Sequence, residues 1–251
     1  MNETMTHNTQ GSDILSAPVA DKELTDMLRA GIHLGHAKSK THTSMQGYVF
    51  GIRNTIALID LVKTQTKMNA ALDVVRDIVA RGGMVLLVGT RPAGRKAISE
   101  VADEINMPYF IERWIGGTLT NFKEIHKRVA YMEALEAEQQ SGGFEKYPKK
   151  ERMKKDEEIQ RLRKNFNGLR LLKRLPDLVF VVDINEDITA VREATQCKVP
   201  VIALVDTNSN AKLIDYPIPS NDDALPAVRY MVGRVKEAIL EGKRMVVEKK
   251  A

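Results

Sequence analysis

The sequence has little cysteine, few aromatic residues and no long apolar run. Its single cysteine, Cys197, excludes an internal disulfide and fits a reducing compartment. Apolar neighbours such as Val199 indicate that this thiol is buried rather than nucleophilic. No stretch approaches the roughly 18 apolar residues of a membrane span, and the N-terminus lacks the basic and then apolar pattern of a signal peptide. We therefore expect a soluble, cytoplasmic protein with no membrane partner.

Motifs of enzymes are also missing. No Ser-His-Asp or Cys-His arrangement has a supporting context. Residues 89–96 nearly spell a Walker loop, but Arg95 precedes the lysine and Ala97 stands where the magnesium-binding hydroxyl belongs. Three histidines lie close in sequence (His33, His36 and His42), yet no cysteine or fourth ligand accompanies them, which disfavours zinc. We expect no catalytic residue, no metal, no cofactor and no small-molecule substrate.

The pattern that is present alternates strands with helices. Residues 1–20 are polar and aperiodic, and we expect a disordered tail there. Beyond a short helix at 21–28, apolar runs of strand length occur at 55–60, 84–88, 109–111, 178–182, 201–205 and 216–218. Helical periodicity occurs at 63–80, 93–104, 186–196 and 221–241. This order predicts an α/β fold with a doubly wound parallel sheet.

Residues 121–174 interrupt that alternation. Apolar residues recur every three or four positions in two stripes, one from Phe122 to Leu135 and one from Ile159 to Leu172. Glycines at 142–143 and Pro148 separate the stripes, so we expect an antiparallel hairpin of two helices whose stripes bury each other and little else. The predicted domains are then a discontinuous sheet domain (21–120 and 175–242), the hairpin (121–174) and a basic C-terminal tail (243–251).

Positive charge is concentrated in the hairpin. The segment holds 15 Lys and Arg against 9 Asp and Glu, a balance of +6 in a chain whose net charge is +5. A basic arm on a nearly neutral body suits binding to a phosphate backbone. The alternative is a solvated coiled-coil surface whose mixed charges only maintain solubility.

Candidate RNA-binding residues lie in the hairpin and in loops of the sheet domain. In the hairpin they are Lys123, Lys127, Lys149, Lys150, Lys154 and Lys155. In the loops they are Lys38, Lys40, Arg53, Arg91, Arg95, Lys96, Arg113 and Trp114. Trp114, the only tryptophan, adjoins an arginine and two glycines, so its ring either stacks on a base or packs under the hairpin.

Three expected strands end in an aspartate: Asp60, Asp183 and Asp206. Such acids can form the metal or phospho-acceptor cluster of a receiver-like domain, which keeps a nucleotide-binding or receiver-like enzyme open as the alternative function. Aspartate at a strand end more commonly caps the following helix, and we interpret 206–209 and 220–223 first as turns and caps.

Many short blocks resemble the bacterial-type small ribosomal subunit protein S2 family, in that family's order. They are Gly35-His36, Tyr48 to Asn54, Ile59-Asp60-Leu61 with Lys63-Thr64, Val88-Gly89-Thr90, Arg113 to Phe122, Leu175-Pro176-Asp177, Glu193-Ala194, Val205 to Asn208 and Asn221 to Ala224. The resemblance extends from about Leu24 to Gly242. It implies a flavodoxin-like doubly wound parallel sheet with an inserted antiparallel helical (coiled-coil) hairpin.

The resemblance also implies a function. A member of this family would be a non-catalytic, ribosome-bound component of the small subunit that binds ribosomal RNA and neighbouring proteins, including protein S1. Two blocks depart from the family pattern: residues 40–45 lack its aromatic and proline, and Ser220 replaces a usual glycine. The first departure weakens the expectation of RNA contacts by that loop.

Overall fold

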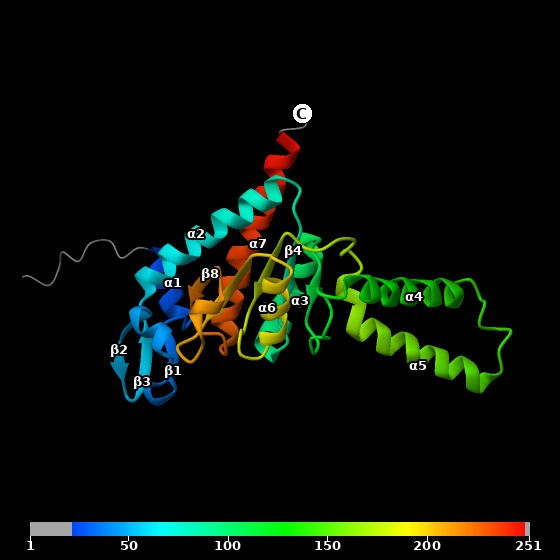
Figure 1. Cartoon of the computed structure of the whole chain (residues 1–251), viewed down its shortest axis with the longest axis horizontal. Coiled ribbons are helices and arrows are strands. Elements are labelled where there is room, and N and C mark those ends of the chain that lie inside the picture. The colour runs from blue at the N-terminus through cyan, green and yellow to red at the C-terminus, as the bar shows by residue number, and fades with distance from the viewer. Residues whose placement is uncertain (1–21, 249–251) are drawn as a thin grey trace, which may run out of the picture.

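The computed structural model describes residues 22–248, and the expected tail at 1–20 lies outside this range. Figure 1 shows an α/β body with a small sheet at one end and a projecting pair of helices at the other. In the described part of the chain, no helix combines the length and apolarity that a membrane crossing needs.

The central sheet has five parallel strands in the order β5-β4-β6-β7-β8. Counted along the chain within this sheet, the order is 2-1-3-4-5, which is a common doubly wound order. The strands are β4 (Val85–Val88), β5 (Tyr109–Phe110), β6 (Leu178–Val181), β7 (Val201–Val205) and β8 (Tyr216–Pro219). Every residue of β4, β6 and β7 is buried, as expected for parallel strands covered on both faces.

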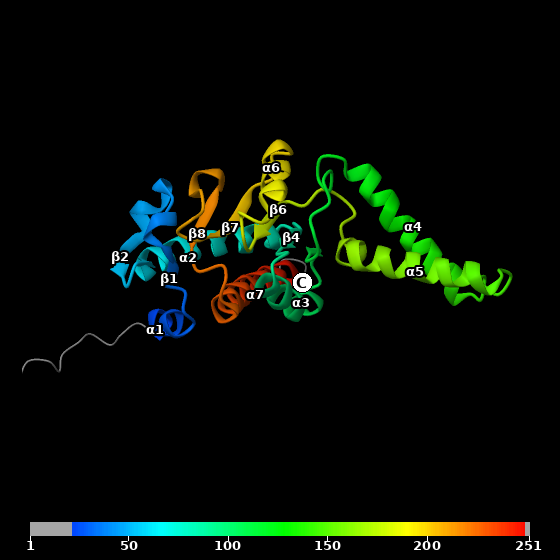
Figure 2. The same cartoon turned by 90° about the horizontal axis from the view of Figure 1, so that it is seen from below.

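Helices cover both faces of this sheet. On one face, residues of α2 (Leu61–Ala80), α3 (Pro92–Ile105) and α7 (Leu225–Glu248) share a core with Leu87, Phe180 and Leu204. On the other, α6 (Ile188–Gln196) shares a core with Val88, Val181 and Ala203. Figure 2 shows α6 on the opposite side of the strands from α3 and α7. The predicted strands and helices of this region are therefore confirmed in position.

The prediction that the strand at 55–60 belongs to the parallel sheet was wrong. Residues 56–59 form β3, which pairs antiparallel with β1 (Leu34–Ala37) and β2 (Val49–Arg53) in a separate sheet. The reason is local: Asn54 and Thr55 both have positive φ, 49° and 68°, and turn β2 back on β3 as a tight hairpin. Helix α1 (Lys22–Arg29) precedes this sheet.

The C-terminal boundary also differs from the expectation. Helix α7 continues to Glu248, so the first six residues of the expected tail at 243–251 are helical. Gly242 allows this continuation to lie close to α2, because a Cβ there would come within 2.8 Å of the Val79 side chain.

Between β5 and β6 the chain forms helices α4 (Phe122–Gln140) and α5 (Lys149–Phe166), which lie side by side in Figures 1 and 2. Four short 3-10 helices complete the fold: η1 (Lys38–Lys40), η2 (Thr43–Tyr48), η3 (Asn167–Leu169) and η4 (Ala211–Leu213).

Candidate nucleic-acid interface

Helices α4 and α5 bury the two predicted stripes. Ile125, Val129, Met132 and Leu135 of α4, and Ile159, Leu162 and Phe166 of α5, are all at most 9% exposed. The expectation that these stripes bury little else was wrong. The core that contains them continues through Leu169 to Phe110 and Val88 of the central sheet. Gly168 makes this contact possible, because a Cβ there would lie 2.2 Å from the carbonyl oxygen of Tyr109. The inner end of the helix pair is therefore anchored on the sheet.

A buried carboxylate also ties the two helices together. Glu136 of α4 is 7% exposed, and its Oε1 accepts hydrogen bonds from Arg163 of α5 and from Arg170 Nη2, the latter at 2.7 Å. The hydrogen bond from Arg170, helped by that from Arg163 and opposed by burial, lowers the pKa of Glu136 to about 2. Two of the basic residues of the segment, Arg163 and Arg170, thus pair with a buried acid within the arm.

At the outer end of the helix pair, Lys155 has structural partners. Its Nζ lies 5.1 Å from the ring centroid of Phe144, 4.5 Å from that of Tyr147 and 3.5 Å from Glu138 Oε2. Cation–π contacts with the connecting segment and an ion pair with α4 hold this lysine against the protein. Its sequence neighbours do not share that environment.

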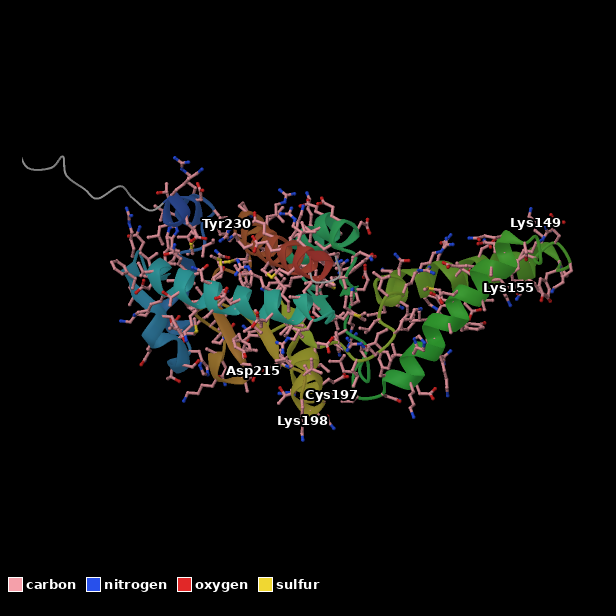
Figure 3. All side chains as sticks on the ribbon, turned by 90° about the horizontal axis from the view of Figure 1, so that it is seen from above. Lys149, Lys155, Cys197, Lys198, Asp215 and Tyr230 are labelled. Atoms are coloured by element: carbon pink, nitrogen blue, oxygen red, sulfur yellow. The ribbon has the colours of Figure 1, made fainter. Side chains whose placement is uncertain are left out.

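Lys149, Lys150 and Lys154 are exposed on α5. Among the described residues, no carboxylate oxygen lies within 4.0 Å of their amino groups. Figure 3 shows Lys149 and Lys155 at the far end of the helix pair, away from the sheet. On α4, Lys123 is likewise exposed, whereas Lys127 pairs with Glu124 at 2.6 Å. The outer end of the arm therefore carries several cations that are available to a polyanion.

The loop candidates occupy two other places. Lys38, Lys40 and Arg53 are exposed on or beside the antiparallel sheet, at the end of the molecule opposite the arm (Figure 1). The other loop candidates follow two strands of the central sheet along the chain: Arg91, Arg95 and Lys96 come after β4, and Arg113 and Trp114 come after β5. The structure thus does not gather the predicted cations into one patch.

Arg91 and Arg95 already have acidic partners. Arg91 Nε lies 2.8 Å from Asp183 Oδ2, and its Nη1 donates to Asp223 Oδ1 at 2.5 Å. Arg95 Nη2 donates to the carbonyl of Thr90 at 3.2 Å, and its Nη1 lies 3.4 Å from Glu112 Oε1. Their charges are balanced within the chain, more completely for Arg91 than for Arg95.

Trp114 belongs to a loop organised by Glu193 of α6. The indole Nε1 donates to Glu193 Oε1 at 3.1 Å, and the amides of Gly117 and Leu119 donate to the same carboxylate at 2.8 and 2.9 Å. Burial raises the pKa of Glu193, but these hydrogen bonds outweigh it and hold the pKa below its usual value. The ring also lies 5.0 Å from that of Phe110. Sequence reasoning did not predict that Glu193 binds this loop. The signal for it was an acidic residue on the apolar face of α6, beside Ala190, Val191 and Ala194.

The strand-end aspartates divide into two groups. Asp60 caps α2, because its Oδ1 accepts from the amides of Val62 and Lys63 at 3.1 and 3.3 Å. Asp183 and Asp206 follow the neighbouring strands β6 and β7 and are each 1% exposed. Asn221 Oδ1 accepts from the amides of Asp223 and Ala224, so the predicted turn at 220–223 is confirmed.

That turn adds two more acids to the strand ends. Asp222 is 1% exposed, and neither of its carboxylate oxygens has a hydrogen-bond partner in the described structure. Burial, with the negative charges of Asp183, Asp206 and Asp223, raises the pKa of Asp222 to about 9. The group is thus a cluster of four acids, of which Asp183, Asp206 and Asp222 are buried, and Arg91 pairs with Asp183 and Asp223.

His36 joins this group from β1. Its Nδ1 lies 3.0 Å from Asp206 Oδ2 and its Nε2 lies 3.2 Å from Asp223 Oδ2. Gly35 permits the approach, because a Cβ there would lie 2.5 Å from the Thr207 side chain. One ligand atom from each of His36, Asp206 and Asp223 lies within 4.8 Å of the others, so this set could hold a divalent cation. The other two histidines of the sequence motif take no part: His42 Nδ1, for example, bonds Ser44 Oγ at 2.8 Å.

Comparison with known proteins agrees with this architecture. The model of the family described as "Ribosomal protein S2" matches residues 27–242. The small ribosomal subunit protein uS2 of Thermus thermophilus is 42% identical over 223 residues, which cover 89% of this chain and 87% of that protein. The uS2 protein of Dehalococcoides mccartyi is 41% identical over 218 residues, covering 87% and 89%. The chain therefore belongs to the ribosomal protein S2 family.

Proposed function

We propose that this chain is a structural constituent of the small ribosomal subunit, where it binds ribosomal RNA and neighbouring proteins. The observation that carries the proposal is the combination of family membership with exposed cations on a projecting, anchored arm. The protein works by holding RNA and protein surfaces in place, and not as an enzyme. It is accordingly ribosome-bound in the cytoplasm.

In this proposal, residues 121–174 are a coiled-coil RNA-binding arm on a sheet domain made of 21–120 and 175–242. Lys149, Lys150 and Lys154 contact phosphates, because each neutralised phosphate releases counterions and favours association. Lys123, at the start of α4, is a further exposed cation of the arm. Contacts of this kind read the RNA backbone rather than its bases, so binding depends strongly on salt and little on sequence.

The antiparallel sheet provides a surface for a protein neighbour. Phe50 is 79% exposed, Ile52 51% and Ile56 40%, although all three are apolar side chains of one small sheet. Phe50 and Ile52 lie two residues apart on β2 and share one face, whereas Ile56, paired with Arg53, lies on the other face. Exposed apolar side chains that share a face, as Phe50 and Ile52 do, are typical of protein interfaces. Protein S1 is the neighbour that the family resemblance implies, and its binding is part of the proposal.

The test is sedimentation of lysate from cells that produce a tagged version of the full chain. We expect the chain to migrate with the small subunit at moderate salt and to be released as salt rises. A chain that stays at the top of the gradient at every salt concentration would instead be a free RNA-binding regulator. Equilibrium binding of labelled ATP with magnesium tests the enzyme alternative, which micromolar affinity would favour.

A further inference from the structure

A polar cavity lies at the carboxyl edge of the central sheet, between the segments that follow β4 and β6. The chain leaves β4 toward β5 and leaves β6 toward β7, so the two connections run in opposite directions. In open α/β sheets, ligands bind in the crevice at such a switch point. The cavity here has a volume of about 660 Å³, within the range of ligand sites in proteins.

The floor of the cavity is rigid. Asp187 is 1% exposed, and its carboxylate accepts hydrogen bonds from the Thr90 hydroxyl at 2.8 Å and the Thr90 amide at 3.2 Å. These bonds join the loop after β4 to the start of α6. This part of the cavity lining is therefore held in place before any ligand arrives.

One wall of the cavity is the ring of Trp114, which contacts with Glu193 and Phe110 hold in place. Trp114 lines the cavity, while its indole nitrogen is bonded to Glu193 and its ring lies against Phe110. Gly116, two residues along the same loop, lines the mouth. A ring with a fixed orientation at the border of a polar cavity can stack on a flat ligand without losing side-chain freedom.

The polar groups of the cavity differ in what they can bind. Arg113 is exposed, and among the described residues no carboxylate oxygen lies within 4.0 Å of its guanidinium. With Arg95 it offers donors for a phosphate. Glu186 and Thr189, on the α6 side, offer acceptors for the amino or hydroxyl groups of a base or ribose.

We propose that this cavity binds a single unpaired nucleotide, with its base against Trp114 and its phosphate at Arg113 and Arg95. This inference rests on the proposed RNA-binding function and extends it to a second kind of contact. The arm binds the backbone of RNA, whereas the cavity accepts one residue that is turned out of the stack, which is how proteins commonly recognise unpaired RNA. A free nucleotide carries the same chemistry, and the experiment separates the two sources.

The intrinsic fluorescence of the full-length chain measures binding directly, because Trp114 is its only tryptophan. AMP, adenosine, a short unpaired RNA and a fully paired RNA are titrated separately. We expect saturable quenching by AMP in the millimolar range, tighter quenching by the unpaired RNA, and little change with the duplex. AMP binding tighter than unpaired RNA would overturn the RNA assignment in favour of a free nucleotide.

Two glycine variants test whether the cavity is the site. Gly116 lines the cavity and a Cβ there meets no atom within 4 Å, so Gly116→Leu adds a bulky side chain at the cavity wall without displacing the backbone. We expect it to weaken AMP binding about tenfold or more. Gly47→Leu is the matched control, because Gly47 is equally open and lies outside the cavity. Arg113→Gln should weaken binding of AMP but not of adenosine.

Quenching that persists in Gly116→Leu, or the absence of quenching by every unpaired ligand, would overturn the inference. Neither result would contradict the proposed function, because sedimentation with the small subunit tests that function separately. Conversely, a chain that binds AMP in this cavity but never joins a subunit would overturn the proposed function alone.

Discussion

At the scale of single residues, buried acids decide the geometry near the candidate interface. Glu193 is 7% exposed and receives hydrogen bonds from the indole of Trp114 and from three backbone amides of the same loop, those of Gly117, Leu119 and Thr120. A carboxylate can accept from all of these donors because it carries no proton of its own. The position of the only tryptophan therefore depends on a residue of α6.

Glu193→Gln should loosen this loop. The amide group of glutamine would present N–H donors to the N–H donors of the loop, so part of the network would be left unsatisfied. We expect a loss of about 1–3 kcal/mol in the free energy of unfolding and a red shift of Trp114 emission. Denaturant unfolding followed by fluorescence measures both. Glu157→Gln, at an exposed acid of α5 outside this loop and cavity, should change neither, and equal effects of the two variants would contradict this role.

The acidic group at the strand ends predicts binding of a divalent cation. His36, Asp206 and Asp223 supply a nitrogen and two oxygens that lie within 4.8 Å of one another, and their carboxylates would balance the charge of a bound cation. Calorimetric titration with zinc should show one site per chain. Asp223→Asn should weaken that site about tenfold, whereas Asp73→Asn on α2 should not. Equal zinc affinity of the two variants would show that the cation binds elsewhere.

At the scale of elements, the helix pair depends on an ion cluster as well as on its apolar stripes. Glu136 accepts hydrogen bonds from Arg163 and Arg170, and its pKa lies at about 2 in the folded chain. In an unfolded chain the pKa of glutamate is about 4.3. The stabilisation by this carboxylate is therefore complete above about pH 4.3 and is lost as the pH falls toward 2.

Glu136→Gln should lower the free energy of unfolding by about 1–3 kcal/mol at pH 7 and by less at pH 3. Urea unfolding at the two pH values gives the comparison. Glu124→Gln is the control, since Glu124 forms an exposed pair with Lys127 and should have no measurable effect at either pH. A Glu136→Gln deficit that does not shrink in acid would contradict the charge-based explanation.

The outer lysines of α5 should control affinity for RNA without affecting the fold. Replacing Lys149, Lys150 and Lys154 with Gln should leave the melting temperature unchanged and reduce the salt slope of RNA binding by about two. Lys155 is left intact because it contacts the rings of Phe144 and Tyr147. A control with Lys22, Lys67 and Lys212 replaced, all exposed on the body, removes the same charge. If the control loses as much affinity, the arm is not the main RNA contact.

At the scale of the whole molecule, the two exposed surfaces lie far apart. The apolar antiparallel sheet and the cationic arm stand at opposite ends of the body in Figure 1. The central sheet, with both faces buried, fixes the distance and direction between them. Such a body can contact a protein at one end and RNA at the other.

Shortening the arm tests this division. Replacing residues 138–156 with Gly-Ser-Gly removes the outer lysines but retains Leu135, Glu136, Ile159 and Arg163. We expect the shortened chain to unfold in one cooperative transition with native Trp114 emission, because the inner end of the arm still packs on the sheet. Its binding to small-subunit ribosomal RNA should be much weaker in a filter-binding assay. Unchanged binding would assign the RNA contacts to the body.

The sequence by itself determined the features that depend on neighbouring residues. Helical and strand periodicity, the glycine and proline breakers and the local excess of lysine are all short-range patterns, so the α/β alternation and the basic helix pair were predictable. The ordered family blocks likewise identified the family from the sequence alone.

Only the tertiary structure decided which distant residues meet. Asp183, Asp206 and Asp222 follow β6, β7 and β8, which are neighbours in the central sheet, and His36 reaches Asp206 from β1 of the other sheet. The tertiary structure likewise pairs Arg91 with Asp183 and Lys155 with Glu138. It also places residues 56–59 in the antiparallel sheet. The physical reason is that burial and pairing of charges depend on packing between elements, which the order of residues along the chain does not contain.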